Sequence, residues 1–329
     1  MPLLEVEDLA VYYPVKSGIW GKKKMLKAVD GVSFTIERGE TVGLVGESGC
    51  GKSTLGRAVV KLEEPCRGAI RLDGVDMASV KGSRLRKMRQ KFQMIFQDPY
   101  GSLNPRMTVF AALDEVISLH RKLSPEERRA QAVELLELVG LPPEALDRYP
   151  HQFSGGQRQR IGIARALALE PDLVVADEPV SALDVSVQAS IVNLLEDIQK
   201  KRGTAFLFIA HDLAVVEHIS NRILVMYLGN IVEEAPAHEL VAEPLHPYTR
   251  MLIDAIPLLT PASERGKTAS PVAAEAVSQI ELPSGCPFHP RCPHATERCR
   301  NEKPQLLPVR NSKRRCACFL CETGSEEQR

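Results

Sequence analysis

The chain has 329 residues, more than one hydrophobic core usually serves, so we expect one large subdivided domain and a smaller appendage. Lys plus Arg and Asp plus Glu both number 42, and the net charge of zero gives no basic excess that would indicate nucleic acid as the main partner. No uninterrupted apolar run approaches the roughly 18 residues of a membrane span, and the acidic residues 1–8 do not resemble a signal sequence. We therefore expect a soluble chain that stays inside the cell.

The first 42 residues favour β-strands. Residues 3–9 and 32–36 alternate apolar and polar side chains, and residues 38–40 indicate a turn. Tyr12 and Tyr13 follow the first of these strands, where an aromatic ring can stack on a nucleobase. A plain strand-end tyrosine fits the same spacing equally well.

Residues 46–54 form a glycine-rich turn between an apolar run, residues 41–45, and a helix-compatible segment, residues 55–61. Backbone N–H groups at a helix N-terminus can bind phosphate where glycine leaves no side chain in the way. In the pattern G-x-x-x-x-G-K-S, Lys52 reaches the outer phosphates and Ser53 offers its hydroxyl to Mg²⁺. The turn therefore predicts a nucleotide site made by Gly46, Ser48, Gly49, Cys50, Gly51, Lys52, Ser53 and Thr54.

The next segments predict a strand with a tight turn at residues 68–74 and a solvated basic helix at residues 81–91. Residues 94–96 predict a short buried strand that opens into a loop at Gln97. From about residue 100 to residue 168 the pattern turns helical, which predicts a helical insertion between strands.

Two later apolar strands end in side chains that suit phosphate chemistry. Residues 173–176 run into Asp177 and Glu178, and a buried parallel strand of this kind places an acid beside a phosphate loop. We predict that Asp177 holds Mg²⁺ and that Glu178 orients and polarises the attacking water. Residues 205–210 end in His211, which can bond a γ-phosphate oxygen, although taken alone it is more simply a structural histidine.

A second Ser-Gly-Gly turn, within residues 153–160, opens a predicted helix and makes a second anion site. Two phosphate-binding turns in one chain are explained by a head-to-tail dimer in which each turn completes the other subunit's site. With this signature the sequence resembles the ATP-binding subunit of an ATP-binding cassette (ABC) transporter, over roughly residues 3–255.

The resemblance implies an α/β fold, with a P-loop NTPase (RecA-like) core, an antiparallel β flap and the helical insertion. It implies that adenine stacks on Tyr13, with Tyr12 a near competitor, and that residues 181–184 cross the dimer interface. The implied catalytic set is Glu178, His211 and Gln97, and the implied Mg²⁺ ligands are Ser53, Gln97 and Asp177. The γ-phosphate held by the opposing subunit would be bound by Ser154, Gly155, Gly156 and Gln157.

Two positions depart mildly from the family pattern. Phe153 replaces the usual leucine, and Cys50 stands where serine or alanine is commoner. A cysteine at a helix N-terminus can be an acidified, oxidisable thiol. The alternative is that Cys50 is simply a small residue.

The C-terminal part concentrates six of the eight cysteines between Cys286 and Cys321. A Pro/Ala/Ser/Glu-rich stretch, residues 256–282, is predicted to be a linker that separates the cassette (1–255) from a small Cys-rich extension (283–329). In a reducing compartment, crowded cysteines indicate a metal site before a disulfide. A segment this small usually needs a bound metal or a disulfide to stabilise its fold. Buried thiols without metal remain the alternative.

Residues 246–250, 285–288 and 291–293 resemble the C-terminal region of ATPases from the oligopeptide and dipeptide importers, whose relatives also import nickel and glutathione. That resemblance favours a structural [4Fe–4S] cluster over a Cys₄ zinc site. It places the ligands at Cys286, Cys292, Cys299 and Cys318, with Cys316 and Cys321 as competitors for the last position.

We therefore expect an ATPase that binds two MgATP across a subunit interface and drives import of di- or oligopeptides. Its expected partners are a second ATP-binding subunit, two transmembrane permease subunits and, through these, an extracytoplasmic substrate-binding protein, with no nucleic acid. It would lie peripherally on the cytoplasmic face of the inner membrane. The rival classes are a soluble cassette ATPase working on ribosomes or DNA, and a metal-binding regulator that merely senses ATP.

Overall fold

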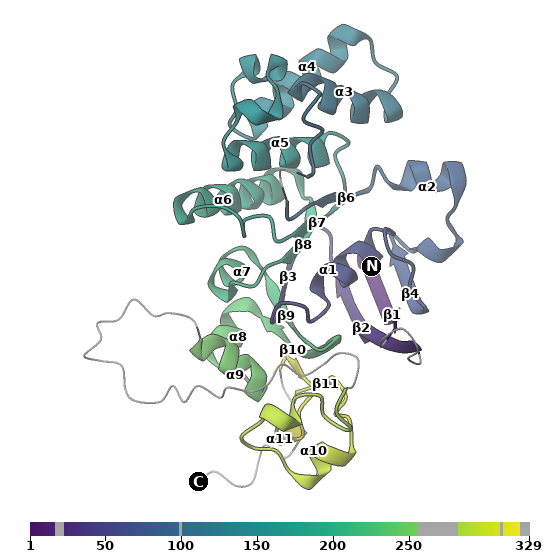
Figure 1. Cartoon of the computed structure of the whole chain (residues 1–329), viewed down its shortest axis with the longest axis vertical. Coiled ribbons are helices and arrows are strands. Elements are labelled where there is room, and N and C mark those ends of the chain that lie inside the picture. The colour runs from purple at the N-terminus through teal and green to yellow at the C-terminus, as the bar shows by residue number, and fades with distance from the viewer. Residues whose placement is uncertain (17–22, 99–100, 256–281, 310–311, 323–329) are drawn as a thin grey trace, which may run out of the picture.

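The computed structural model describes residues 1–16, 23–98, 101–255, 282–309 and 312–322. Most of the predicted linker and the last seven residues lie outside this part of the chain. In the described residues the strands form two sheets, which stack around helix α1 (Lys52–Val59) (Figure 1). The larger sheet carries the phosphate loop, and the smaller one is the predicted flap.

The flap is a sheet in the order β2-β1-β4-β5. Its strands are β1 (Leu4–Lys16), β2 (Lys23–Ile36), β4 (Arg67–Leu72) and β5 (Val75–Asp76), and they pair antiparallel. The first two strands are longer than their sequence pattern predicted. The β1–β2 pairing has register shifts after Val6, Leu9 and Val11, and each such shift interrupts the alternation of side chains between the faces.

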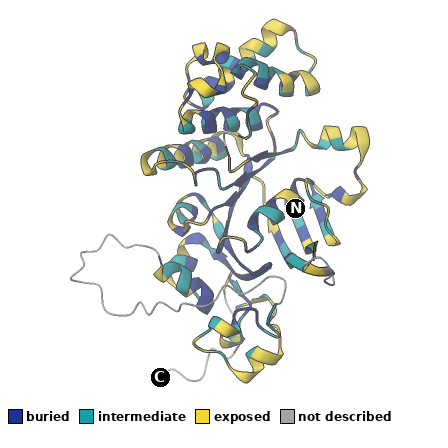
Figure 2. Ribbon diagram, viewed as in Figure 1, coloured by how far each residue is buried: buried dark blue, intermediate teal, exposed yellow. Residues whose placement is uncertain are grey.

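The larger sheet has the order β11-β12-β10-β9-β3-β8-β7-β6 in the described residues. Five neighbours are parallel, namely β6 (Phe92–Ile95), β7 (Leu173–Asp177), β8 (Ala205–Ile209), β3 (Thr41–Val45) and β9 (Arg222–Tyr227). Every residue of β3, β7 and β8 is buried, as their continuous apolar runs predicted (Figure 2). The parallel order brings the ends of β3, β6, β7 and β8 to one edge, where the predicted site residues follow.

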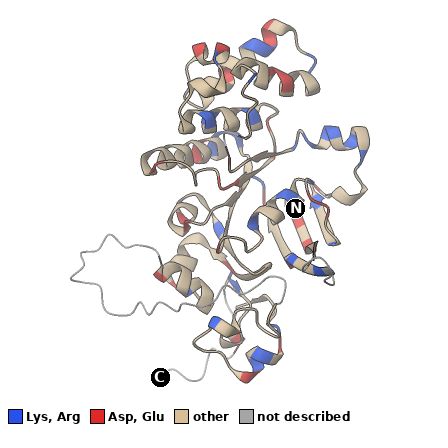
Figure 3. Cartoon of the chain, in the orientation of Figure 1, with Lys and Arg blue, Asp and Glu red and all other residues tan. Residues whose placement is uncertain are grey.

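Helices cover this sheet and build the insertion. The insertion contains α3 (Val109–His120), α4 (Pro125–Leu138) and α5 (Gly155–Leu167), with short 3₁₀ turns between α4 and α5. The remaining cassette helices are α2 (Gly82–Met88), α6 (Val185–Arg202), α7 (Leu213–Ile219), α8 (Ala237–Ala242) and α9 (Pro247–Asp254). Helix α2 has no buried residue along its length and carries exposed lysine and arginine side chains, so the predicted solvated basic helix is present there (Figure 3). Among the described helices, none combines the length and apolar character that a membrane crossing needs.

The Cys-rich extension is joined to the cassette through the larger sheet. Its short strands β11 (Leu307–Pro308) and β12 (Arg315–Cys316) extend that sheet, because β12 pairs antiparallel with β10 (Asn230–Pro236). Two short helices, α10 (Glu297–Asn301) and α11 (Phe319–Glu322), complete the extension. Its Phe288 is 2% exposed and belongs to the same apolar cluster as the cassette interior. The extension is therefore packed onto the cassette.

Candidate functional site

The turn between β3 and α1 has a backbone that requires glycine at two points. Gly46 has φ +153°, and an added Cβ would lie 2.1 Å from the carbonyl oxygen of Met226. Gly51 has φ +111°, and its Cβ would lie 2.0 Å from the carbonyl oxygen of Ala28. Both glycines thus let the turn approach neighbouring backbone closely while it leads into the N-terminus of α1.

Lys52 lies inside this turn and is 4% exposed. Its Nζ donates hydrogen bonds to the carbonyl oxygens of Gly46 at 2.7 Å and Glu47 at 3.0 Å. These two bonds hold the ammonium of Lys52 against the backbone of the loop. A phosphate bound by the loop would find this positive charge already in place.

Ser53 and Asp177 meet although 124 positions separate them. Ser53 Oγ donates to Asp177 Oδ1 at 2.8 Å, and Asp177 is 2% exposed at the end of β7. Burial raises the pKa of the Asp177 carboxyl, and the hydrogen bond from Ser53 opposes that rise. Two oxygen donors beside a phosphate loop are the ligand type that Mg²⁺ prefers, so this pair fits the predicted metal.

Glu178 follows directly and has a left-handed backbone with φ +46°, which is uncommon for a residue with a side chain. Its N–H donates to the carbonyl of Ile209 at 2.9 Å, which fixes this conformation against β8. Gln97 Nε2 donates to Glu178 Oε2 at 2.7 Å, so the loop after β6 meets the end of β7. His211 lines one small cavity with Glu178.

The two tyrosines that sequence could not separate have different partners. Tyr12 donates its hydroxyl to Asp30, and burial, reinforced by that bond, raises the pKa of Tyr12 to about 12. Burial also raises the pKa of Tyr13, but a hydrogen bond with Thr54 opposes the rise. Tyr13 therefore contacts the phosphate loop, whereas the hydroxyl of Tyr12 bonds a residue of the flap.

The second Ser-Gly-Gly turn caps α5. Ser154 Oγ accepts from the N–H of Gln157 at 3.3 Å, and Gln157 Oε1 accepts from the N–H of Ser154 at 3.0 Å, which completes a capping box. An added Cβ on Gly156 would lie 2.4 Å from Val187 Cγ1, and one on Gly155 would lie 3.5 Å from Leu183 Cδ2. The turn thus packs against the segment at the start of α6, and these described contacts do not bring it to the chain's own phosphate loop.

The surroundings of Cys50 favour a small buried residue over an acidified thiol. The side chain is 3% exposed, and burial raises its pKa even though the ammonium of Lys52 acts in the opposite direction. A helix N-terminus lowers a thiol pKa only when desolvation does not outweigh it. Cys50 is a small buried residue of the loop.

The cysteines of the extension divide into two groups. Cys286, Cys292, Cys299 and Cys318 line one small cavity together with His246 and His289. Burial raises the pKa of Cys286 to about 11, and the hydrogen bond with Cys321 raises the pKa of Cys318. Cys321 Sγ donates to Cys316 Sγ at 3.2 Å, and neither of these two lines the cavity. Nowhere in the described residues are three or more His, Cys, Asp or Glu side chains arranged to hold a metal ion.

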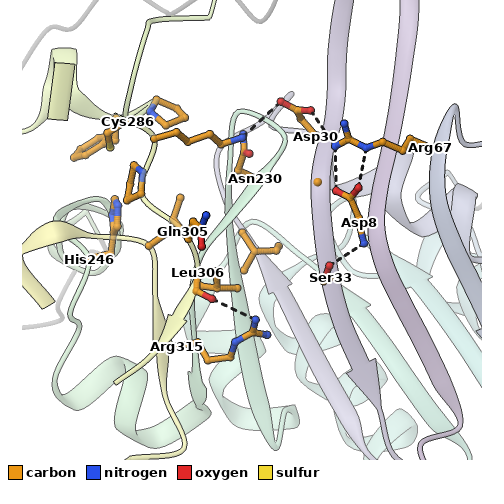
Figure 4. A pocket seen from close by; sticks show the side chains of 18 residues that line it. Asp8, Asp30, Ser33, Arg67, Asn230, His246, Cys286, Gln305, Leu306 and Arg315 are labelled. Atoms are coloured by element: carbon orange, nitrogen blue, oxygen red, sulfur yellow. Dashed lines mark hydrogen bonds and ion pairs between the residues drawn. The ribbon is translucent and has the colours of Figure 1, made fainter. Parts of the chain in front are cut away.

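A larger cavity of about 610 Å³ lies between the flap, β10 and the extension (Figure 4). Its charged side chains pair with one another: Arg67 bonds Asp8 at 2.9 Å, and Lys303 lies 3.6 Å from Asp30. Arg315 donates to the carbonyl of Leu306 at 3.3 Å. Arg315 also pairs with Glu234 at 3.1 Å, so each of the three basic side chains on this wall has an acidic partner that neutralises the charge a triphosphate would need.

Sequence analysis did not predict that residues outside the loop would hold Glu47. Arg291 of the extension pairs with the Glu47 carboxylate, and Tyr248 on α9 accepts a hydrogen bond from its N–H. Both residues lie in the stretches that resemble peptide-importer ATPases, yet no local pattern indicates their target. Arg291 and Glu47 are 244 positions apart in the sequence, so only the folded structure reveals that they pair.

Comparisons with known proteins agree with this geometry. The ABC transporter family matches residues 29–181, and the family described as the oligopeptide/dipeptide transporter C-terminal region matches residues 232–299. A relative from Sinorhizobium fredii, named "Probable peptide ABC transporter ATP-binding protein y4tS", is 52% identical over 97% of this chain and 90% of its own length. The dipeptide transport ATP-binding protein DppF of Haemophilus influenzae is 48% identical over 97% of this chain and 96% of its own.

Among solved structures, the ATP-binding cassette MJ0796 in a dimeric post-hydrolysis state with ADP and Pi is similar at a TM-score of 0.64. It is 30% identical and covers 71% of this chain and 98% of its own. The loop, the paired strand ends and the relatives lead to one conclusion. This chain belongs to the ABC transporter family as one of its ATP-hydrolysing subunits, which dimerise and work with membrane permease components.

Proposed function

We propose that this chain powers peptide import by hydrolysing MgATP at the loop of residues 46–54. The observation that carries the proposal is the pair of hydrogen bonds Ser53–Asp177 and Gln97–Glu178, which join the start of α1 and the loop after β6 to the end of β7. Lys52 completes the set with a buried positive charge. Metal ligation, phosphate binding and water activation can all take place within this group.

Each residue has a role that its surroundings suit. Lys52 and the N-terminus of α1 bind the phosphates, Tyr13 lies where adenine can stack, and Ser53, Asp177 and Gln97 would hold Mg²⁺. Mg²⁺ held by these residues would supply positive charge that stabilises the negative charge of the phosphates. Glu178 orients and polarises the attacking water, and His211 in the same cavity bonds the γ-phosphate.

The proposed dimer places the turn of residues 154–157 over the nucleotide of the opposite subunit. In support, this turn presents a capped helix N-terminus, and its own bonds leave it apart from the loop of the same chain. The ATPase pair would lie on the cytoplasmic face of the inner membrane, against two permease subunits that receive cargo from an extracytoplasmic binding protein. The names of the relatives favour dipeptides and oligopeptides as cargo over nickel or glutathione.

Gln97→Ala tests the coupling of hydrolysis to transport. Gln97 touches Glu178 from the loop that joins the sheet to the helical insertion, so it can transmit movement between them. We expect ATP affinity within about twofold of wild type and peptide uptake into reconstituted vesicles reduced by about tenfold or more. The control is Gln93→Ala, on the adjoining strand, whose side chain bonds only the carbonyl of Arg89 in the described contacts. Equal losses of binding and uptake would assign Gln97 a purely nucleotide-binding role.

We also propose that Cys286, Cys292, Cys299 and Cys318 hold a structural iron–sulfur cluster. Four thiols facing one cavity supply the donor set, and a cluster spaces its ligands more widely than a single ion does. The cluster would staple the extension, since nothing in the ATPase cycle needs an electron.

Anaerobically purified protein should then be brown, with roughly four irons per chain. Cys292→Ser should lose the colour, whereas Cys316→Ser should keep it, because Cys316 bonds Cys321 and does not line the cavity. Colourless wild-type protein with one zinc would favour the zinc site instead. Protein with neither metal would leave a set of buried thiols.

A further inference from the structure

We propose that the Cys-rich extension positions the phosphate loop through Arg291, so that ATP binding by the cassette depends on an extension residue that never touches the nucleotide. The proposal rests on the proposed nucleotide site at residues 46–54. Arg291 acts through Glu47, the second residue of that loop. It is a positioning residue.

The contact has the geometry of a specific clamp. Arg291 Nη1 donates to Glu47 Oε2 and Nη2 donates to Oε1, both at 2.8 Å, so the two planar groups meet in a fork. The Arg291 side chain is only 15% exposed, and Glu47 is 41% exposed. A largely buried guanidinium that pairs through two hydrogen bonds fixes the orientation of the Glu47 carboxylate and also neutralises its charge.

Arg291 is itself held by contacts with both the cassette and the extension. Its guanidinium lies 5.9 Å from the ring centre of Tyr227 and 5.8 Å from that of Phe288, and it donates to Met251 Sδ at 3.3 Å. Tyr227 and Phe288 pack edge to face with ring centres 5.3 Å apart. The guanidinium of Arg291 therefore packs against two aromatic rings while it bonds the loop.

Glu47 is also fixed through its backbone. Its N–H donates to Tyr248 Oη at 2.8 Å, and its carbonyl oxygen accepts from Lys52 Nζ at 3.0 Å. Tyr248 is fully buried on α9. One loop residue thus links the extension, the last cassette helix and the phosphate-binding lysine, and its position affects where the ammonium of Lys52 is held.

Removal of Arg291 has two consequences for the nucleotide. The loop loses an anchor, and the Glu47 carboxylate remains as an uncompensated negative charge close to the phosphates. Both weaken ATP binding. The water-activating residues follow β6 and β7, and the described hydrogen bonds of Arg291 run to Glu47 and Met251 instead, so turnover at saturating ATP should change little.

The test compares Arg291→Ala with Arg298→Ala in the full-length chain. Arg298 also directly precedes a cavity cysteine, but its ion pairs run to Glu302 and Glu322 within the extension. We expect Arg291→Ala to weaken ATP binding and raise the KM for ATP by about tenfold, equivalent to ~1.4 kcal/mol, with kcat within about twofold. Arg298→Ala should match wild type, and Arg291→Lys should fall between, because lysine offers a point charge without the fork.

A double-mutant cycle separates positioning from simple docking of the extension. If Arg291 acts through Glu47, adding Arg291→Ala to Glu47→Ala should weaken ATP binding no further. Should Arg291→Ala fail to fold, Tyr248→Phe supplies the second arm, since it removes only the hydroxyl bonded to Glu47 and should weaken binding by about threefold. Wild-type affinity in Arg291→Ala would overturn the proposal, as would equal losses in Arg291→Ala and Arg298→Ala. Where Arg291→Ala does not fold, wild-type affinity in Tyr248→Phe would overturn it.

Lys52→Ala distinguishes failure of the inference from failure of the proposed site. If Lys52→Ala loses ATP binding while Arg291→Ala keeps it, the nucleotide site stands and the positioning role is wrong. If Lys52→Ala binds ATP as well as wild type, the nucleotide site itself is misplaced.

Discussion

Glu178→Gln should reduce the rate of ATP hydrolysis by at least about 100-fold, ~2.7 kcal/mol of barrier, while ATP still binds. The amide keeps the shape of the side chain but cannot polarise water as a carboxylate does. Lys52, Ser53 and Asp177 remain in place, so the phosphates and Mg²⁺ keep their partners. ATP should then hold two subunits together, because the bound nucleotide persists across the dimer interface.

The measurement is steady-state phosphate release combined with size-exclusion chromatography in the presence and absence of ATP. Glu170→Gln is the matched control, since Glu170 also has a left-handed backbone, with φ +52°, but pairs with Arg121 on the surface just before β7. It should hydrolyse ATP like wild type. Hydrolysis at the wild-type rate by Glu178→Gln would contradict the catalytic assignment, and an absence of ATP-dependent association would contradict the dimer site.

The core of the fold could be predicted because its signals are local. A buried parallel strand is a continuous apolar run, and a phosphate loop needs glycines, a lysine and a hydroxyl within a few positions. The grouping of Gln97 with Asp177 and Glu178 came from the resemblance, and it agrees with the rule that neighbouring parallel strands end on the same side. The lengths of the flap strands could not be predicted, because register shifts along β1 interrupt the alternation of apolar and polar residues that indicates a strand.

Features that depend on distant partners could not be predicted. The sequence left two interpretations of Cys50 open, an acidified thiol and a small residue, and the burial that raises its pKa and decides between them comes from the packed fold. The strands β11 and β12 have two residues each and exist through pairing with β10, so no periodicity marks them. Resemblance, and not spacing, selected Cys318, and the structure places it with Cys286, Cys292 and Cys299.

The clamp on Glu47 also explains why the extension is packed onto the sheet. A mobile appendage could not hold a guanidinium against the loop with both distances at 2.8 Å. The pairing of β12 with β10 and the burial of Phe288 supply the rigidity that this contact requires. A staple at the four cavity cysteines would therefore stabilise the nucleotide loop as well as the extension itself.

Lys52→Ala should weaken ATP binding by about 100-fold or more, since hydrogen bonds to charged groups contribute about 1.5–3 kcal/mol each and this ammonium can bond more than one phosphate oxygen. Lys61→Ala is the matched control. Lys61 lies just past the opposite end of α1 and likewise bonds two backbone carbonyls, those of Met77 at 2.6 Å and Val80 at 3.0 Å. Saturating MgATP should raise the Tm of wild type and of Lys61→Ala but leave that of Lys52→Ala unchanged, because a ligand stabilises only the folded state that binds it. A full MgATP shift in Lys52→Ala would show that the triphosphate binds elsewhere.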